Sequence, residues 1–307
     1  MVTKIVTDST ADLPPWLAEA WGITVVPLEV RFGSEVYRDG VDLDADGFYH
    51  KLTTSPSFPA TSQPSPGAFA EVYRRLTQEA HEVLSLHISA KLSGTYAAAL
   101  AGRAALNSPG RIEVVDSLQC SMGLGLLGLL AARMADSPMA QILEQVRRAI
   151  PRTYLLGVVD SLEYLRRGGR IGKVEAFLGT LLKVKPIIAC VDGEAHPLER
   201  VRTRERALER LVERVRDLGP LEEMAVLHST DAAEAERFLE RLAPTLPLEK
   251  LHRARFGPVL GTYLGPGAFG VALRTSALLP AQDSPLRQAQ HGASHHRHPE
   301  LVEGGAG

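Results

Sequence analysis

The chain has 307 residues, of which 34 are basic and 36 acidic, and its formal charge of −2 argues against a partner held by overall charge, such as duplex DNA. Hydrophobic residues make up 45% of the chain and aromatic residues only 6%, which predicts a sizeable and mainly aliphatic core. The two cysteines, Cys120 and Cys190, exclude a disulfide framework and a four-cysteine zinc site, and they favour a reducing, cytoplasmic setting.

No segment predicts a signal peptide or a membrane span. The first residues lack the apolar stretch of a signal peptide before Asp8. The longest apolar segment, residues 117–132, is too short to cross a hydrocarbon layer of about 30 Å. Glycines also interrupt this segment, so we expect it to form a buried helix.

The first half of the chain alternates between β-type and helical patterns. Strands are expected over residues 4–7, 23–30, 83–88 and 111–115, and helices over 14–21, 44–52, 67–80, 95–106 and 117–132. Residues 31–40 predict a hairpin or a loop, and residues 53–66, rich in Thr, Ser and Pro, predict a loop. Repetition of strand and helix implies a parallel sheet that is covered on both faces.

The second half of the chain mixes a hairpin with further strand–helix units. Strands are expected over residues 153–159, 225–228, 251–255 and 271–274, and a β-hairpin over residues 186–201. Helices are expected over residues 161–167, 174–182, 203–218 and 231–242, and a glycine-rich loop over residues 261–270. The Asp192-Gly193 pair indicates a type I′ turn in the hairpin. This pattern favours an α+β domain with a mixed sheet.

The predicted fold class is therefore α/β with two domains. We expect an N-terminal Rossmann-like domain with a parallel sheet over residues 1–157, and a C-terminal α+β domain with a mixed sheet over residues 158–280. Residues 281–307 contain no aromatic residue and predict a disordered tail. The histidines of its HHRH cluster are interpreted as solvated side chains rather than metal ligands.

Two hydroxyl-rich loops are the most informative polar features, since the chain lacks the common phosphate-loop, dinucleotide, zinc-protease and GxSxG strings. Residues 61–65 read TSQPS and residues 89–95 read SAKLSGT, and each loop precedes a predicted helix. Ligands of open parallel sheets bind beyond the carboxyl ends of the strands, where helix N-termini offer free N–H groups. The loops therefore suit an anionic head group, and Ser and Thr there equally suit helix capping.

Other polar features allow two interpretations. The stretch 164–172, YLRRGGRIG, suits a phosphate or a partner, and it equally suits the end of a helix, where Arg and Gly are favoured. His87 and His228 each lie at the end of an expected apolar strand. We interpret both as hydrogen-bonded structural histidines rather than catalytic bases.

Eight motifs in order along residues 4–275 resemble those of one family. They read IVTDSTADLP, TSQPSPGAF, ISAKLSGTY, VVDS, YLRRGGRI, LKVKPII, RVRTRERAL and GPVLGTYLGPGAFG. In content and order they are similar to the motifs of the DegV family. The resemblance implies two α/β domains with one fatty acid lodged between them.

The resemblance also implies a role, that of the non-catalytic, lipid-binding subunit of a fatty acid kinase whose ATP-using subunit is a separate chain. It implies that Thr61 and Ser93 bind the carboxylate, with Ser62 and Gly94 beside them. The expected partners are a long-chain fatty acid such as palmitate and an ATP-dependent kinase subunit. No cofactor, metal or nucleic acid is expected.

The resemblance also implies roles for three further residues. Arg170 and Arg202 are implied as contacts for a phosphate or for the kinase subunit. Many family members have a GTHxGPG loop, whereas the histidine position here holds Tyr263. A phenol donates a hydrogen bond but is uncharged at neutral pH. We therefore expect carboxylate binding to survive and proton exchange by a histidine at this position to be lost.

Two alternative functions remain open. A serine-dependent acyl hydrolase would use Ser93 as its nucleophile and His87 or His228 as its base, although no nucleophile elbow surrounds Ser93. A module that binds a sugar or a small phosphometabolite would need a polar pocket. A lipid carrier would need apolar walls, for which residues 118–130 and 177–182 are the candidates.

Overall fold

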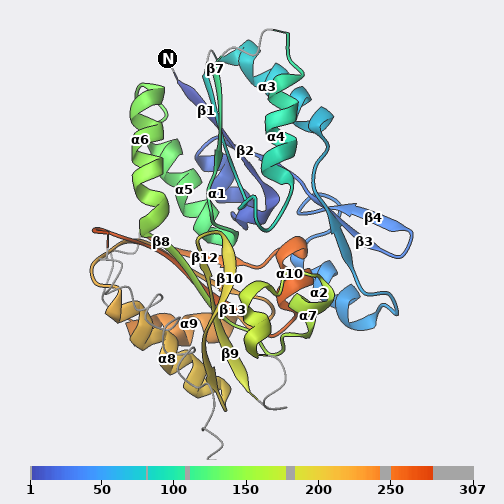
Figure 1. The fold of residues 1–307 in the computed structure, drawn as a ribbon, viewed down its shortest axis with the longest axis vertical. Helices are drawn as coiled ribbons and strands as arrows, with labels where there is room; N and C mark the ends of the chain where they lie inside the picture. The colour runs from blue at the N-terminus through green and yellow to red at the C-terminus, as the bar shows by residue number, and fades with distance from the viewer. Residues whose placement is uncertain (1, 81, 108–110, 178–183, 243–249, 279–307) are drawn as a thin grey trace, which may run out of the picture.

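The structure is a computed structural model that describes residues 2–80, 82–107, 111–177, 184–242 and 250–278. Its two lobes are each built on a β-sheet, and the N-terminal sheet lies above the C-terminal sheet in Figure 1. The fold class predicted from the sequence, α/β with a parallel first sheet and a mixed second sheet, is confirmed. The tail expected over 281–307 lies outside the described residues.

Four parallel strands form the N-terminal sheet in the order β2-β1-β6-β7. They are β1 Thr3–Asp8, β2 Ile23–Val26, β6 Glu82–His87 and β7 Arg111–Asp116. Both β1 and β6 are almost wholly buried, although their sequences, TKIVTD and EVLSLH, mix apolar with polar residues. The apolar side chains of Val6, Leu84 and Leu86 are fully buried. Their carboxyl ends point toward the second lobe (Figure 1), as ligand sites on open parallel sheets require.

Helices cover both faces of this sheet, as predicted. They are α1 Pro15–Ala20, α3 Pro66–Glu79, α4 Thr95–Ala104, α5 Ser121–Arg133 and α6 Met139–Ala149. In Figure 1, α3 and α4 lie on one side of the strands and α5 and α6 on the other. The apolar segment expected to be a buried helix is α5, and none of the helices in the described part of the chain is long and apolar enough to span a membrane.

A small antiparallel sheet in the order β4-β3-β5 projects from this lobe. Its strands are β3 Glu29–Phe32, β4 Glu35–Arg38 and β5 Ala60–Ser62, and α2 Ala45–Thr54 connects β4 to β5. Two expectations are corrected here. The single strand expected over 23–30 is divided at Pro27, because proline cannot donate to a strand ladder. The loop expected over 53–66 contains β5, which pairs with β3.

Six strands form the C-terminal sheet in the order β10-β9-β8-β13-β11-β12. They are β8 Thr153–Val158, β9 Lys185–Val191, β10 Glu194–Val201, β11 Leu221–His228, β12 Leu251–Arg255 and β13 Phe269–Thr275. The turn between β9 and β10 has φ of 51° at Asp192 and 83° at Gly193, as the predicted type I′ turn requires. The domain boundary expected near residue 157 falls inside β8.

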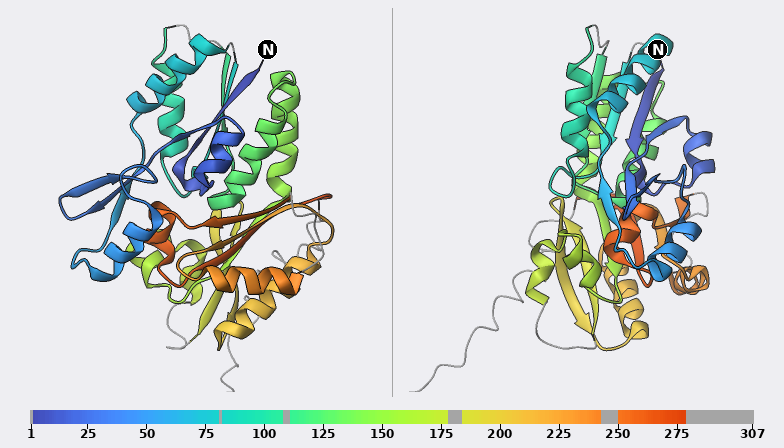
Figure 2. Two further views of the ribbon diagram at one scale, coloured as in Figure 1. Left: turned by 180° about the vertical axis from the view of Figure 1, so that it is seen from behind. Right: turned by 90° about the vertical axis from the view of Figure 1, so that its right-hand side faces the viewer.

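Two amphipathic helices, α8 Arg204–Asp217 and α9 Ala232–Leu242, cover one face of this sheet (Figures 1 and 2). Helix α5 of the N-terminal lobe packs on the other face, against β8, β11 and β13. A single hydrophobic cluster therefore runs from Ile5 and Leu84 in the first sheet to Ile188 and Ala225 in the second.

Two short helices border the space between the lobes, α7 Glu163–Arg167 and α10 Pro258–Leu264. The glycine loop expected over 261–270 is wrong in its first part, because residues 261–264 belong to helix α10. A Cβ at Gly261 would lie 2.5 Å from Phe48 Cε1, so glycine is needed for close packing on α2 rather than for a turn. Of the helix expected over 174–182, residues up to Phe177 form the 3₁₀-helix η3 Gly172–Phe177, and 178–183 lie outside the described residues.

Candidate functional site

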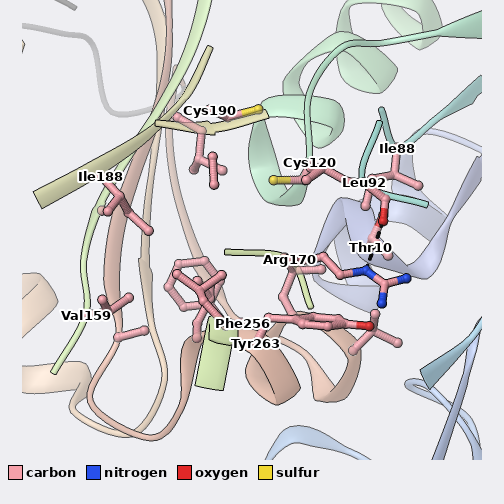
Figure 3. Close-up of a pocket in the computed structure, with 18 of the residues that line it drawn as sticks. Thr10, Ile88, Leu92, Cys120, Val159, Arg170, Ile188, Cys190, Phe256 and Tyr263 are labelled. Carbon is pink, nitrogen blue, oxygen red and sulfur yellow. Dashed lines mark hydrogen bonds between the residues drawn. The ribbon is translucent and has the colours of Figure 1, made fainter. Parts of the chain in front are cut away.

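A cavity of about 330 Å³ lies between the two lobes, at the carboxyl ends of the parallel strands. Its lining comes from both lobes, with Thr10, Thr61 and Ser93 on one side and strands β8 and β9 on the other. The volume is within the range of roughly 300–1,000 Å³ that is typical of small-molecule sites. Figure 3 shows this cavity with its lining side chains.

Most of the cavity wall is apolar. The aliphatic and aromatic part of the lining includes Leu92, Leu155, Leu156, Val158, Val159, Ile188, Phe256, Leu260 and Phe269. These residues come from five separate segments of the chain, so no single run of sequence encodes the wall. Of the two segments proposed as walls, 118–130 contributes Cys120 to the lining, and 177–182 lies outside the described residues except for Phe177.

The polar side of the cavity includes a hydroxyl pair from opposite ends of the chain. Thr61 Oγ1, on β5, is hydrogen-bonded to the phenol oxygen of Tyr263, on α10. Tyr263 therefore lies beside Thr61, where the family resemblance implied it, and Ser62 lines the same cavity. If Thr61 donates in this pair, the phenol proton of Tyr263 is free for a ligand acceptor.

Ser93 joins the same cavity from the loop between β6 and α4. Its hydroxyl is hydrogen-bonded to Thr95 Oγ1 at 2.8 Å, and it also accepts from the Thr95 N–H at 3.3 Å. Gly94 is absent from the described lining but packs against Gln63, because a Cβ at Gly94 would lie 2.1 Å from Gln63 Oε1. The two hydroxyl-rich loops are therefore in direct contact, as the hypothesis of one shared site requires.

Arg170 crosses from the second lobe to the first at this end of the cavity. Its Nε donates to the backbone oxygen of Leu92 at 3.2 Å, and its guanidinium lies 5.2 Å from the centre of the Tyr263 ring (Figure 3). Gly168, at the end of α7, permits this stack, since a Cβ there would lie 2.3 Å from Tyr263 Cδ1. The glycines of the YLRRGGRIG stretch thus end a helix, and its last arginine reaches the cavity.

Arg202 is not brought to the cavity among the described residues. It is exposed and follows the last residue of β10, whereas Ala195, near the start of that strand, lines the cavity. The two arginines inferred from the resemblance therefore lie in different surroundings.

The two histidines considered as catalytic bases do not contact Ser93. His87 Nδ1 is 3.0 Å from Asp8 Oδ2, and its Nε2 is 2.7 Å from Ser85 Oγ, with all three side chains buried in the first lobe. His228 lies outside the cavity lining, and burial lowers its pKa. The interpretation as a hydrogen-bonded structural histidine agrees with this geometry for His87, whereas Nδ1 of His228 is buried without a hydrogen-bond partner among the described residues. Neither histidine is placed to act as a base for Ser93.

Two buried carboxyl groups tie α10 to the first lobe. Asp12 Oδ1 accepts from the Gly257 N–H at 2.9 Å, and Asp12 Oδ2 accepts from Ser121 Oγ at 2.5 Å. Burial raises the pKa of Asp12 well above its ordinary value. Burial also raises the pKa of Asp39 to about 7, despite hydrogen bonds from Ser9 and from the backbone of Val259. These groups hold the helix that carries Tyr263.

Several lining residues carried no signal in the sequence. Thr10 follows β1 inside a motif that we noted only for the family resemblance. Cys190 and Phe256 lie at the cavity because of long-range packing, which no local spacing reveals. Within the described ranges, no group of three or more His, Cys, Asp or Glu side chains is arranged to hold a metal ion.

Comparison with known proteins identifies the family. A family model described as "Uncharacterised protein, DegV family" matches residues 2–276. A DegV domain-containing protein of Deinococcus radiodurans is 39% identical over 278 residues, covering 89% of this chain and 98% of the relative. Protein DegV of Bacillus subtilis is 34% identical over 280 residues, covering 88% of this chain and 98% of that protein.

Solved structures show the same fold. A DegV family protein from Thermus thermophilus, described for its fatty acid binding, superposes with a TM-score of 0.83 at 36% identity, covering 90% of this chain and all of that one. A stearic acid-binding protein from Eubacterium ventriosum superposes with a TM-score of 0.80 at 28% identity, covering 89% of this chain and 98% of that one. This chain therefore belongs to the DegV family.

Proposed function

We propose that this chain binds one long-chain fatty acid in the cavity between its lobes. The carboxylate lies at Thr61, Ser93 and Tyr263, and the acyl chain runs along β8 and β9. The observation that carries the proposal is the division of one cavity into a hydroxyl-bearing part and an apolar wall. The fatty acid binding described for the Thermus thermophilus and Eubacterium ventriosum relatives supports the same assignment.

The energetics of an acyl chain fit this cavity. Transfer of one methylene from water to an apolar wall is worth about 0.8 kcal/mol. A chain of roughly 14 methylenes gains on the order of 11 kcal/mol by that measure, against which association costs about 4–15 kcal/mol. The apolar wall must therefore supply most of the affinity, and the hydroxyl groups chiefly fix which end of the lipid lies where.

Neutral donors suit the carboxylate because a buried ion pair would require the desolvation of a second charge. The hydrogen-bonded pair of Thr61 and Tyr263 keeps one hydroxyl proton for the carboxylate, and Ser93 offers a second when Thr95 donates in their hydrogen bond. Arg170 is held over the Tyr263 ring and by the Leu92 carbonyl, so its charge lies near the site without replacing the hydroxyl groups.

We further propose that the bound carboxylate is presented to a separate ATP-dependent kinase subunit. A second hollow of about 240 Å³ shares Leu92, Arg170 and Ala195 with the lipid cavity and adds Lys91 and Lys173. Cations beside the carboxylate end suit the phosphoryl group of an acyl phosphate. Glu194 lies 3.5 Å from each lysine and limits the net positive charge of this hollow.

Lipid extraction tests the binding proposal. Protein purified without added lipid is denatured and extracted, and the extract is examined by mass spectrometry. One fatty acid per chain is expected. Protein that carries none, and that remains empty after delipidation and incubation with palmitate or oleate, contradicts the proposal.

Acyl phosphate formation tests the kinase proposal separately. The lipid-loaded chain is mixed with a fatty acid kinase subunit and ATP, and the acyl phosphate is trapped with hydroxylamine. Arg170→Ala is expected to lower the yield while lipid remains bound. Tyr263→His supplies the side chain that many family members carry, and a large gain in yield would show that the tyrosine limits transfer. No product with any variant would remove the kinase role and leave binding intact.

A further inference from the structure

The two cysteines of the chain meet at the cavity although they belong to different lobes. Cys120 immediately precedes α5 in the first lobe, and Cys190 lies on β9 in the second. Both line the cavity, and both are buried, with 8% and 7% of their surface exposed. Figure 3 draws both side chains at the cavity, and the thiol of Cys190 lies within hydrogen-bond contact of the thiol of Cys120.

Hydrogen bonds hold β9 against the segment that leads to Cys120. Cys190 Sγ donates to the backbone oxygen of Leu118 at 3.6 Å. At the tip of the same hairpin, Ser89 Oγ donates to the backbone oxygen of Gly193 at 2.8 Å. A Cβ at Gly193 would touch both Ser89 and Leu118, so glycine permits this close contact. The sulfur of Cys190 is therefore fixed beside the turn that presents Cys120.

That turn has an unusual backbone. Leu118 and Ser121 both have φ of 51°, in the left-handed region that non-glycine residues rarely adopt. The Leu118 N–H donates to Asp116 Oδ1 at 3.0 Å, and Ser121 Oγ donates to Asp12, so both positions are held in place. Strained residues of this kind cluster at functional sites. Here they bracket Cys120 and set the direction of its side chain.

We propose that Cys120 and Cys190 form an oxidation site, which a hydroperoxide carried on a fatty acyl chain converts into a disulfide between the lobes. The inference rests on the proposed lipid-binding function, because the cavity would deliver the oxidant. Nothing in the lipid-binding role itself requires two thiols in contact. The closed disulfide would join β9 to the start of α5 and slow the exchange of bound lipid.

The chemistry balances without a further reactant. One thiol attacks the terminal oxygen of the hydroperoxide, so that a sulfur–oxygen bond forms, the oxygen–oxygen bond breaks and the lipid leaves as an alcohol. The second thiol then displaces water from the sulfenic acid and the disulfide forms. The two thiols lose two electrons, and the hydroperoxide gains them. An external dithiol reverses the reaction by thiol–disulfide exchange.

An oxidant that resides in the cavity fits the thiols better than one in bulk water. Contact with Cys190, burial, and the neighbouring Asp12 and Asp8 all raise the pKa of Cys120. The thiolate is the reactive form, so dilute hydrogen peroxide should react slowly. A bound lipid hydroperoxide is held at a high effective concentration and compensates for the small thiolate fraction.

The experiment compares oxidants on reduced, delipidated protein. Linoleic acid hydroperoxide and hydrogen peroxide are added at equal concentration, and intact mass and cysteine peptides are followed by mass spectrometry. The chain is expected to lose the mass of two hydrogen atoms, with the Cys120 and Cys190 peptides cross-linked and one hydroxy acid formed per disulfide. The lipid hydroperoxide should act at least tenfold faster, and palmitate already in the cavity should slow it.

Matched variants locate the reaction. Cys190→Ser is expected to stop at a sulfenic acid on Cys120 that dimedone traps, and Cys120→Ser reports the reverse order of attack. Diamide, a small thiol oxidant, tests the geometry alone. If neither diamide nor the lipid hydroperoxide links the two peptides, the site is refuted. If diamide links them but the lipid hydroperoxide is no faster than hydrogen peroxide, the lipid-borne oxidant is refuted.

Palmitate retention, measured on the same samples, separates this inference from the proposed function. Protein that retains palmitate but forms no cross-link refutes the oxidation site only. Protein that forms the cross-link with diamide but retains no fatty acid refutes lipid binding and its role in delivering the oxidant.

Discussion

Thr61 and Tyr263 lie 202 positions apart, yet their hydroxyl groups share a hydrogen bond at the cavity. Ser93 reaches the same cavity from a third segment. All three carry an uncharged hydroxyl group, which fits a site that orients an acid group while an apolar wall supplies affinity. Loss of one hydroxyl group should therefore raise the rate at which the lipid dissociates, while the apolar wall still binds the acyl chain.

Ser93→Ala tests this at a single hydroxyl group. Loss of a hydrogen bond to a charged group typically costs about 1.5–3 kcal/mol, so the lipid off-rate should rise on the order of 10- to 100-fold. Stopped-flow transfer of a fluorescent fatty acid to vesicles measures that rate. Ser276→Ala is the control, because Ser276 is exposed beyond the far end of β13. An unchanged off-rate in Ser93→Ala would remove Ser93 from the site.

Asp39 gives the first lobe a pH dependence of known sign. Its pKa in the folded protein is raised to about 7 by burial, so folding is favoured by its protonated form. Stability from this group is full below about pH 4 and is lost as the pH rises toward 7. One pKa unit is worth about 1.4 kcal/mol, so the total effect is on the order of 4 kcal/mol.

Asp39→Asn should flatten this part of the stability profile, measured by urea unfolding between pH 4 and pH 8. Asp42→Asn is the matched control, because Arg38 lowers the pKa of the exposed Asp42 carboxyl to about 2. Stability from Asp42 is present above about pH 4 and is lost only in stronger acid. If the unfolding free energy of the wild type does not fall between pH 4 and pH 7 relative to that of Asp39→Asn, burial does not raise the pKa of Asp39.

Secondary elements with strong local patterns could be predicted from the sequence. The mainly apolar run over residues 83–88 identifies β6, and Asp192-Gly193 identifies the turn between β9 and β10. Strand β5 and helix α10 could not be predicted in this way. β5 has only three residues and is stabilised by pairing with β3, and α10 is stabilised by contacts with α2 and with Asp12.

In the candidate site, too, residues with a local sequence pattern could be predicted and residues brought together by packing could not. The loops with Thr61 and Ser93 stand out because their hydroxyl groups precede helices, a local feature. Tyr263 could be placed only through the family motif. The packing of the two lobes forms the apolar wall from β8 and β9 and brings Cys120 close to Cys190. Contacts between residues so far apart in the chain produce no regular spacing that could be recognised in the sequence.

Helix α7 positions α10 through one glycine, which provides a test at the scale of elements. Gly168 has φ of −76°, which alanine adopts without strain, but a Cβ there would lie 2.3 Å from the Tyr263 ring. Gly168→Ala should displace Tyr263 and speed lipid release at least several-fold, with little change in unfolding free energy. The fluorescent transfer assay and urea unfolding report the two effects.

Gly102→Ala is the control at a different pair of helices, α3 and α4, away from the cavity lining. A Cβ at Gly102 would lie 2.6 Å from Phe69 Cβ and 2.7 Å from the Pro66 carbonyl oxygen, at the contact of α3 with α4. Overpacking of this kind costs about 1–3 kcal/mol, and lipid release should stay unchanged. If both substitutions lower stability equally and neither alters release, Gly168 has no special role at the site.

At the scale of the whole molecule, one hydrophobic cluster joins the lobes and the cavity lies within their contact. A ligand that touches both lobes should therefore stabilise the whole chain, by about 2.7 kcal/mol at a concentration 100 times its Kd. Thermal unfolding of delipidated protein should shift upward with palmitate. A shift confined to part of the unfolding transition would show that the lipid contacts only one lobe.

Acyl chain length should determine affinity because the wall is apolar. Laurate has four methylenes fewer than palmitate, and at about 0.8 kcal/mol each this is a difference of roughly 3 kcal/mol. Its Kd should therefore be on the order of 100-fold weaker, as measured by displacement of a fluorescent fatty acid. Equal affinities for the two acids would show that the carboxylate contacts, rather than the wall, supply the binding energy.

The most direct test is a crystal structure of the delipidated protein soaked with 16-bromohexadecanoic acid, whose terminal atom is located by anomalous scattering. The account predicts a carboxylate within hydrogen-bond distance of Thr61, Ser93 or Tyr263 and a bromine beside the apolar residues of β8 and β9. A bromine at the hydroxyl end, or a lipid bound elsewhere while this cavity stays filled by its own side chains, would contradict it.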